Sequence, residues 1–88
     1  MPTIIAHHKI TKSAEHWLKS PKRKEVFGAL GVTSIRTFVD PRDQTQVAIL
    51  MDVPDLDALS KAMQSQAAAD AMAFDGVVPE SIVILVEA

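Results

Sequence analysis

Several kinds of residue and segment are missing from this chain of 88 residues. It contains no cysteine, which excludes disulfides and thiolate-bound metals. No apolar run approaches the ~20 residues that a bilayer-spanning helix needs. The N-terminus lacks the basic segment and long apolar core of a signal peptide, and there is no glycine-rich phosphate loop or nucleophile–base signature. We therefore expect a soluble, cytoplasmic protein that is not bound to a membrane.

The charge balance gives no reason to expect nucleic acid or an anionic membrane as a partner. Nine Lys and Arg residues stand against eleven Asp and Glu residues, a net charge of -2 at pH 7. The basic run KSPKRK at 19–24 lacks interleaved aromatic residues, and we interpret it as a solvated helix face. With 48% hydrophobic residues the chain is too apolar for disorder. We predict one folded domain over residues 1–88.

Four segments rich in Ile, Val and Thr predict β-strands. The second and third are separated by the polar sequence DPRDQTQ, which predicts a hairpin turn. The other two gaps are longer and have helical character. The predicted strands cover residues 3–10, 33–39, 46–53 and 81–86, so the order of elements is βαββαβ.

Each helical gap breaks and restarts at a serine, and a glycine follows 11 residues later. These pairs are Ser20 with Gly31 and Ser65 with Gly76. Serine is a favourable N-cap, and glycine adopts the left-handed conformation that ends many helices. Two such βαβ units with right-handed crossovers predict an α+β, ferredoxin-like fold. In that fold a four-stranded antiparallel sheet carries both helical segments on one face.

The predicted strands are apolar on both faces. In the third strand Val47, Ile49 and Met51 alternate with Ala48 and Leu50. A half-exposed antiparallel sheet should instead alternate apolar with polar residues. We therefore predict a homodimer in which the second sheet face is covered by the same face of another copy.

Several stretches resemble short members of the dimeric α+β barrel superfamily. They are IIAHHKI followed by Trp17, the strand VAILMDVPDLDAL and the closing ESIVILVE. Relatives include small antibiotic-biosynthesis-type monooxygenases, EthD-like proteins and short cyclase-like proteins. The resemblance covers almost the whole chain and implies two sheets packed face to face. It also implies a pocket between sheet and helices or in the barrel lumen, but the chemistry of the family varies, so the fold does not give the function.

Two adjacent histidines are the first candidates for chemistry. Neighbouring strand residues point to opposite faces, so at most one of His7 and His8 faces a pocket. An imidazole titrates near neutral pH and could move a proton. Alternation, with a dry helix-facing side, places His7 toward the barrel, whereas the family resemblance points to His8, directly before Lys9. A packed histidine bonded to a neighbour is the structural alternative for either residue.

Other candidates lie on the strands and the first helical segment. Arg36 lies in mid-strand on the same face as Phe38. We expect it to be either a pocket cation that stabilises negative charge or an edge-strand arginine that reaches water or a partner subunit. Trp17 is expected in the core or the pocket wall, and Phe38 is expected to line the pocket. Asp52 closes the third strand, where it either lines the pocket or acts electrostatically on the helix start after Pro54.

The function remains open between classes at this stage. Histidines that diverge do not supply the three or four ligands of a metal site, so we expect no metal and no cofactor. One hypothesis is a cofactor-independent monooxygenase- or cyclase-like enzyme for an aromatic or polyketide-like substrate, with a histidine moving a proton and Arg36 stabilising charge. The alternative is a non-catalytic module that binds a ligand or serves as a structural dimer. The opening Met-Pro adds a Pro2-dependent tautomerase as a third hypothesis, because tautomerases use an N-terminal proline as general base.

Overall fold

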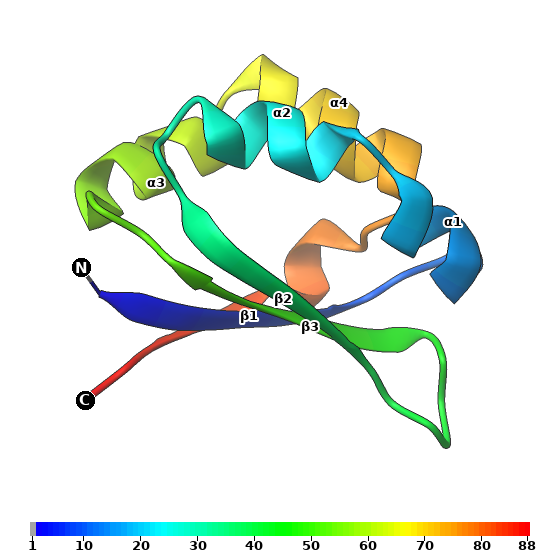
Figure 1. The fold of residues 1–88 in the computed structure, drawn as a ribbon. Helices are drawn as coiled ribbons and strands as arrows, with labels where there is room; N and C mark the ends of the chain where they lie inside the picture. The colour runs from blue at the N-terminus through cyan, green and yellow to red at the C-terminus, as the bar shows by residue number, and fades with distance from the viewer. Residues whose placement is uncertain (1) are drawn as a thin grey trace.

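A four-stranded antiparallel sheet carries helices on one face in the computed structural model, which describes residues 2–88 (Figure 1). The strands are ordered β2-β3-β1-β4. This confirms the predicted α+β class and the ferredoxin-like βαββαβ plan. The elements are β1 (Thr3–Lys9), α1 (Ala14–Lys19), α2 (Lys22–Gly28), β2 (Thr33–Val39), β3 (Gln46–Asp52), α3 (Leu56–Met63), α4 (Gln66–Asp75), the 3-10 turn η1 (Pro79–Ser81) and β4 (Val83–Val86).

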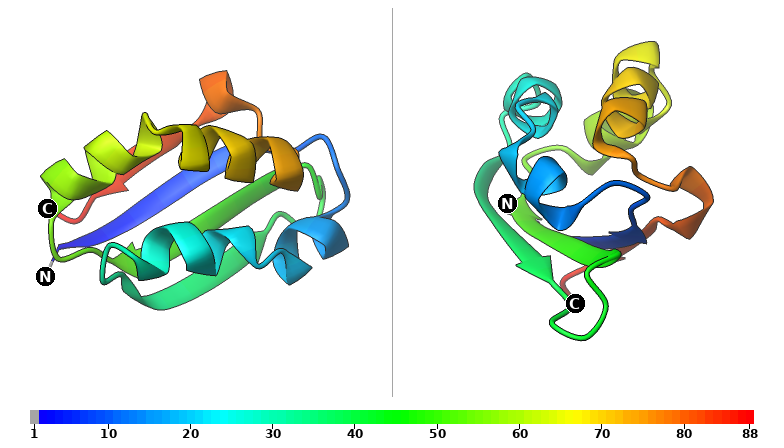
Figure 2. Two further views of the ribbon diagram at one scale, coloured as in Figure 1. Left: turned by 90° about the horizontal axis from the view of Figure 1, so that it is seen from above. Right: turned by 90° about the vertical axis from the view of Figure 1, so that its right-hand side faces the viewer.

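The helices form two broken rods that run side by side above the sheet (Figure 2). One rod is α1 with α2, and the other is α3 with α4. Ser20 lies at the first break, where its Oγ accepts the backbone N–H of Lys22 at 3.2 Å. Ser65 caps α4 through a backbone N–H of its first turn. Gly31 and Gly76 have φ of 73° and 75°. The predicted cap at Ser65 and the two left-handed glycines are therefore confirmed. The prediction for Ser20 is wrong: Ser20 is the C-cap of α1, and Pro21 stands at the N-cap of α2 without a side-chain cap hydrogen bond.

The helix-facing side of the sheet forms the core. Val47, Ile49 and Met51 of β3 are at most 5% exposed, and Trp17 of α1 is 1% exposed against them. Every second residue of β1 is buried on this side, as the period of a half-covered strand requires. The buried cluster consists of Ile4, Ile10, Trp17, Val32, Val47, Ile49, Met51, Val53 and Leu59.

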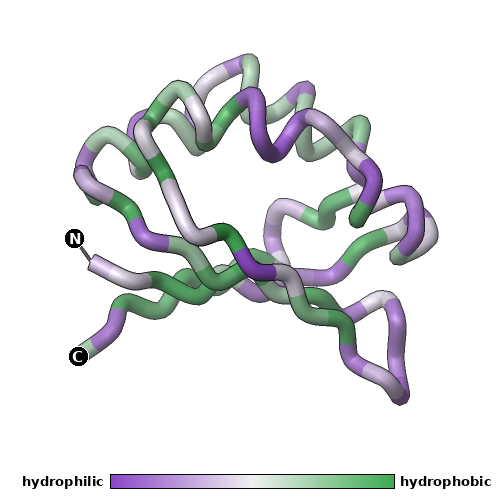
Figure 3. The backbone as a smooth tube through the Cα atoms, viewed as in Figure 1, coloured by the Kyte–Doolittle hydropathy of each residue, from purple (hydrophilic) through white to green (hydrophobic). Residues whose placement is uncertain are grey.

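The other side of the sheet, called the open face below, is uncovered and apolar. Ile5, Phe38, Val83 and Leu85 are each between 40% and 54% exposed there. Figure 3 shows the last strand, which leads to the C-terminus, as an almost unbroken hydrophobic segment. Strand pairing brings the alternate residues of the four strands together on this face: Ile5, His7, Arg36, Phe38, Ala48, Leu50, Val83 and Leu85.

The last strand differs from its prediction. It begins at Val83 rather than at residue 81, because Pro79–Ser81 form a 3-10 turn. The Ser81 hydroxyl holds this turn against β1, since it accepts the Lys9 N–H at 2.8 Å and donates to the Val78 carbonyl at 2.6 Å. All four residues of β4 remain exposed at the edge of the sheet.

Candidate functional site

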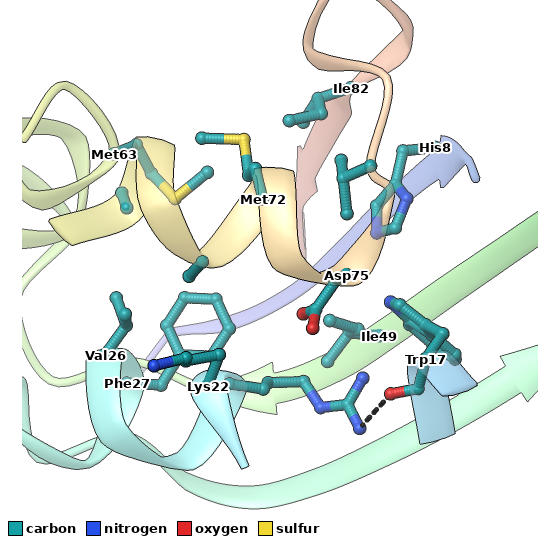
Figure 4. A pocket seen from close by; sticks show the side chains of 14 residues that line it. His8, Trp17, Lys22, Val26, Phe27, Ile49, Met63, Met72, Asp75 and Ile82 are labelled. Carbon is teal, nitrogen blue, oxygen red and sulfur yellow. Dashed lines mark hydrogen bonds between the residues drawn. The ribbon is translucent and has the colours of Figure 1, made fainter. Parts of the chain in front are cut away.

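A cavity of about 70 Å³ lies between the sheet and the helices (Figure 4). Ligand sites usually measure ~300–1,000 Å³, so this cavity is small and has room only for a few water-sized molecules. Two of its walls are flexible methionine side chains, Met63 and Met72, which adapt more readily than branched residues. The other apolar walls include Val26, Phe27, Ile49 and Ile82.

His8 supplies the cavity with a buried imidazole. It is 5% exposed on the helix-facing side of β1, and its ring meets the Trp17 ring edge-on at 5.8 Å. Nδ1 lies 3.4 Å from the Lys9 carbonyl oxygen, a long contact for a hydrogen bond. Burial lowers the pKa of His8 below its ordinary 6.5. The contact with the Lys9 carbonyl raises this pKa and the positive charge of Arg23 lowers it, so the net direction is downward. His8 is therefore a neutral proton acceptor at pH 7.

Arg23 is held in position by the first helical rod. Its guanidinium lies 4.5 Å from the centre of the Trp17 ring, a cation–π distance. Nη2 donates to the carbonyl oxygens of Trp17 at 3.3 Å and Leu18 at 3.4 Å, at the end of α1. Nη1 is buried and has no partner. Burial lowers the pKa of Arg23, and the Asp75 carboxylate opposes this effect.

Asp75 enters the cavity from the other helical rod. It is the last residue of α4 and is 6% exposed. Its carboxylate points toward the space between Phe27 and Ile49 (Figure 4). Oδ1 is buried without a hydrogen-bond partner, and no ion pair joins this carboxylate to Arg23 in the described chain. Arg23 and Asp75 thus line the same cavity without neutralising each other by contact.

The sequence-predicted candidates fall on different sides of the sheet. His8 and Trp17 line the cavity, whereas His7 and Phe38 line a shallow hollow on the open face. The guanidinium of Arg36 lies over the Phe38 ring at 5.6 Å, so Arg36 and His8 are on opposite faces. The alternation argument assumed that no pocket lies between the sheet and the helices, and it therefore placed His7 toward the pocket. The more enclosed cavity does lie between the sheet and the helices, on the side of His8.

Asp52 and Pro2 lie outside the cavity. Asp52 accepts a hydrogen bond from the Thr3 hydroxyl at 2.6 Å across the pairing of β1 with β3. The Pro2 carbonyl accepts the N–H of Val53 at 2.8 Å. Within residues 2–88, no three His, Cys, Asp or Glu side chains are placed to hold a metal ion. No helix in this range is long and apolar enough to cross a bilayer.

Two cavity residues were missed in the sequence. The interpretation of 19–24 as a solvated face is wrong for Arg23, which is half-buried and lines the cavity. Asp75 was not among the predicted site residues. It follows the buried Ala68 and Ala71 by seven and four residues, which places it on the same side of α4. A charged residue in such an apolar stripe was the signal available.

Comparison with known proteins finds likeness in structure only. No protein-family model matches the sequence, and no curated protein matches it either. A crystal structure described as an antibiotic biosynthesis monooxygenase has 16% identity and a TM-score of 0.64, covering 100% of this chain and 97% of its own. A proposed antibiotic biosynthesis monooxygenase from Bordetella bronchiseptica has 13% identity and a TM-score of 0.71, with coverages of 99% and 94%. SnoaB, a cofactor-independent oxygenase from Streptomyces nogalater, has 7% identity and a TM-score of 0.59, with coverages of 99% and 90%.

At such low identity these likenesses concern the fold. They show that this chain shares the overall fold of these structures. Each match spans nearly the whole of both chains, so the shared plan includes the sheet and the helices above it.

Proposed function

We propose that this protein binds a small, largely apolar molecule in the His8 cavity and removes a proton from it. The activity would be that of a cofactor-independent monooxygenase- or cyclase-like enzyme acting on an aromatic or polyketide-like substrate. The observation that carries this proposal is a buried imidazole with a lowered pKa in a mostly apolar cavity. The likeness in fold to SnoaB, described as a cofactor-independent oxygenase, supports it.

The proposed oxygenation balances without an external reductant. His8 takes a proton from an activated methylene group, which leaves a carbanion stabilised as an enolate. Dioxygen adds to that carbon, and the resulting peroxide takes the proton back from His8 to become a hydroperoxide. Cleavage of its O–O bond, with loss of the second methylene hydrogen, releases water and leaves a carbonyl group. One oxygen atom enters the product and the other leaves as water, so the substrate carbon is oxidised and dioxygen is reduced. A cyclase-like reaction would begin with the same proton transfer. The carbanion would then add to a second carbonyl carbon of the substrate, whose π bond breaks and whose oxygen takes the proton back from His8.

Arg23 is placed to stabilise the negative charge that develops on the enolate oxygen. Its free Nη1 is buried at the cavity wall, where a fixed charged donor acts more strongly than in water. The sequence hypothesis gave this role to Arg36, which lies on the other face of the sheet. In the proposed enzyme Arg23 takes that role, and Arg36 belongs to the open face.

We propose further that the open face is the interface of a homodimer. It presents large apolar side chains that are about half exposed, including Phe38 and Leu85. Such a surface is typical of a face that is covered by a partner. A second copy fits because the same patch would face itself across a two-fold axis.

A non-catalytic ligand-binding or structural dimer module is the second candidate. The small volume of the cavity favours it, since about 70 Å³ does not admit an aromatic ring until side chains move. A Pro2-dependent tautomerase gains no support, because Pro2 does not line the cavity.

Oxygen uptake with 1,8-dihydroxyanthrone, whose methylene lies between two aromatic rings, distinguishes the two candidates. The enzyme should consume dioxygen and substrate in equal amounts, faster than buffer alone. His8→Gln should slow this reaction by a factor of about 100 or more, the contribution of a general base. His7→Gln is the matched control and should leave the rate unchanged. Saturable binding of the anthrone, seen as a rise in melting temperature without oxygen uptake, would instead establish the binding module.

A further inference from the structure

The opposed charges of Arg23 and Asp75 point to the chemistry of the ligand. We infer that they form a donor–acceptor pair that selects neutral ligands carrying both a carbonyl oxygen and a hydroxyl group, and that excludes carboxylates. This inference rests on the proposed function only in taking the His8 cavity as the ligand site.

Asp75 is an unfavourable residue for its position in the free protein. A buried carboxylate oxygen that receives no hydrogen bond is unfavourable. Its place at the end of α4 adds to this cost, because the C-terminal end of a helix carries partial negative charge. Oδ1 nevertheless lies buried with no donor. An acceptor held in this way fits a ligand that brings a hydroxyl group.

Arg23 is the complementary donor, and it makes no ion pair with Asp75 in the described chain. Its Nη2 is bonded to the end of α1, and its guanidinium lies over Trp17, so the direction of the side chain is fixed. Nη1 has no acceptor. Because Arg23 belongs to one helical rod and Asp75 to the other, the two charges line the same cavity without making an ion pair.

The balance of charge then decides which ligands fit. Arg23 and Asp75 together contribute no net charge, and His8 is neutral at pH 7. Lys22 also lines the cavity, but its Nζ lies 3.7 Å from the carboxylate of Glu25, which balances its charge. A neutral hydroxy-ketone can accept from Nη1 and donate to Oδ1 while its apolar part lies against Phe27 and Met72. A carboxylate would gain Arg23 but would meet the Asp75 carboxylate, which it cannot satisfy.

Three small probes test this selection in the wild-type protein. They are 2-hydroxyacetophenone with both groups, acetophenone with the carbonyl alone, and benzoate. Binding is followed by NMR through the indole N–H of Trp17, which is the one tryptophan of the sequence and lines the cavity. We expect 2-hydroxyacetophenone to bind about tenfold or more tighter than acetophenone, the effect of a hydrogen bond to a charged group. Benzoate should bind more weakly than either.

Two variants assign this ranking to the pair. Asp75→Asn should remove most of the advantage of the hydroxyl group and should tighten benzoate binding about tenfold, because Arg23 then lacks an opposing carboxylate. Arg23→Met should weaken both ketones and leave benzoate unbound. Asp70→Asn and Lys24→Met, at exposed positions of the same two helices, are the matched controls and should change nothing. The NMR spectrum of each variant reports whether it is folded.

The outcomes separate this inference from the proposed function. Equal affinities for the two ketones in the wild type, or benzoate as the tightest probe, would overturn the pair while leaving the cavity as a binding site. An unchanged ranking in folded Asp75→Asn would do the same. If no probe shifts the Trp17 signal, both the pair and the ligand cavity are refuted. If the three probes bind in the expected order but 1,8-dihydroxyanthrone causes no oxygen uptake, the pair is supported and the proposed catalysis is refuted.

Discussion

Replacement of His8 by alanine should destabilise the protein by an amount that depends on pH. The substitution removes an edge-on contact with Trp17 and enlarges the cavity. It leaves no stranded acceptor, because the Lys9 carbonyl also receives the Val78 N–H at 3.0 Å. The loss of packing and of the ring contact should therefore cost about 1–3 kcal/mol of unfolding free energy at pH 7.5.

The pH dependence follows from the lowered pKa of His8. Because the folded pKa lies below the ordinary 6.5, the unfolded chain binds more protons between the two values. The stability that neutral His8 contributes above pH 6.5 is lost as the pH falls through that interval toward the folded pKa. His8→Ala lacks this titration, so its deficit relative to the wild type should shrink between pH 7.5 and pH 5.5.

Urea unfolding measures both effects when the variants are compared with the wild type at equal protein concentration, at two such concentrations. His7→Ala is the comparison, since His7 is exposed on the open face. Its cost should stay below about 1 kcal/mol, and any loss should vary with protein concentration because His7 lies at the proposed interface. A deficit of His8→Ala that is the same at both pH values would refute the buried neutral imidazole. A cost at His7 equal to that at His8 would refute the assignment of the two faces.

Two further substitutions test the fold and the assembly. Gly76→Ala should cost more stability than Gly31→Ala. Both substitutions force a left-handed conformation on alanine, at about 1–2 kcal/mol. A Cβ at Gly76 would in addition lie 2.9 Å from the backbone nitrogen of Lys12, whereas a Cβ at Gly31 would meet only a side-chain carbon of Pro54 at 3.4 Å. Equal melting temperatures for the two variants would show that this close contact is not present. Leu50→Asp, on the open face, should convert the dimer into a monomer, as measured by sedimentation at micromolar concentration. Ala69→Asp, on the exposed side of α4, is the control and should remain a dimer. A monomeric wild type, or a dimer that survives Leu50→Asp, would contradict the proposed interface.

The fold was predictable because its signals are local. Alternation along β1 and β3 identified which residues share a face, and the paired caps at Ser65 and Gly76 marked the ends of α4. The start of β4 was misplaced because the turn at 79–81 depends on a distant contact, the hydrogen bond between Ser81 and Lys9. A sequence pattern does not contain such pairings.

The candidate site was only partly predictable for the same reason. Alternation separates His7 from His8 but does not indicate on which face a hollow remains. The cavity lies on the helix-facing side, where the small residues Ala68 and Ala71 are part of its wall. Arg23 and Asp75 belong to different helical rods, and their approach to one cavity results from the packing of those rods on the sheet. Residues from separate elements meet only in three dimensions.

The pH profile of oxygen uptake tests the central claim, that His8 removes the substrate proton, most directly. kcat/KM for 1,8-dihydroxyanthrone is measured for the wild type and for His8→Gln. The wild-type value should fall on the acid side with an inflection below pH 6.5, because the free enzyme is active only with neutral His8. His8→Gln should show a low rate without that inflection. An acid-side inflection that persists unchanged in His8→Gln would contradict the claim.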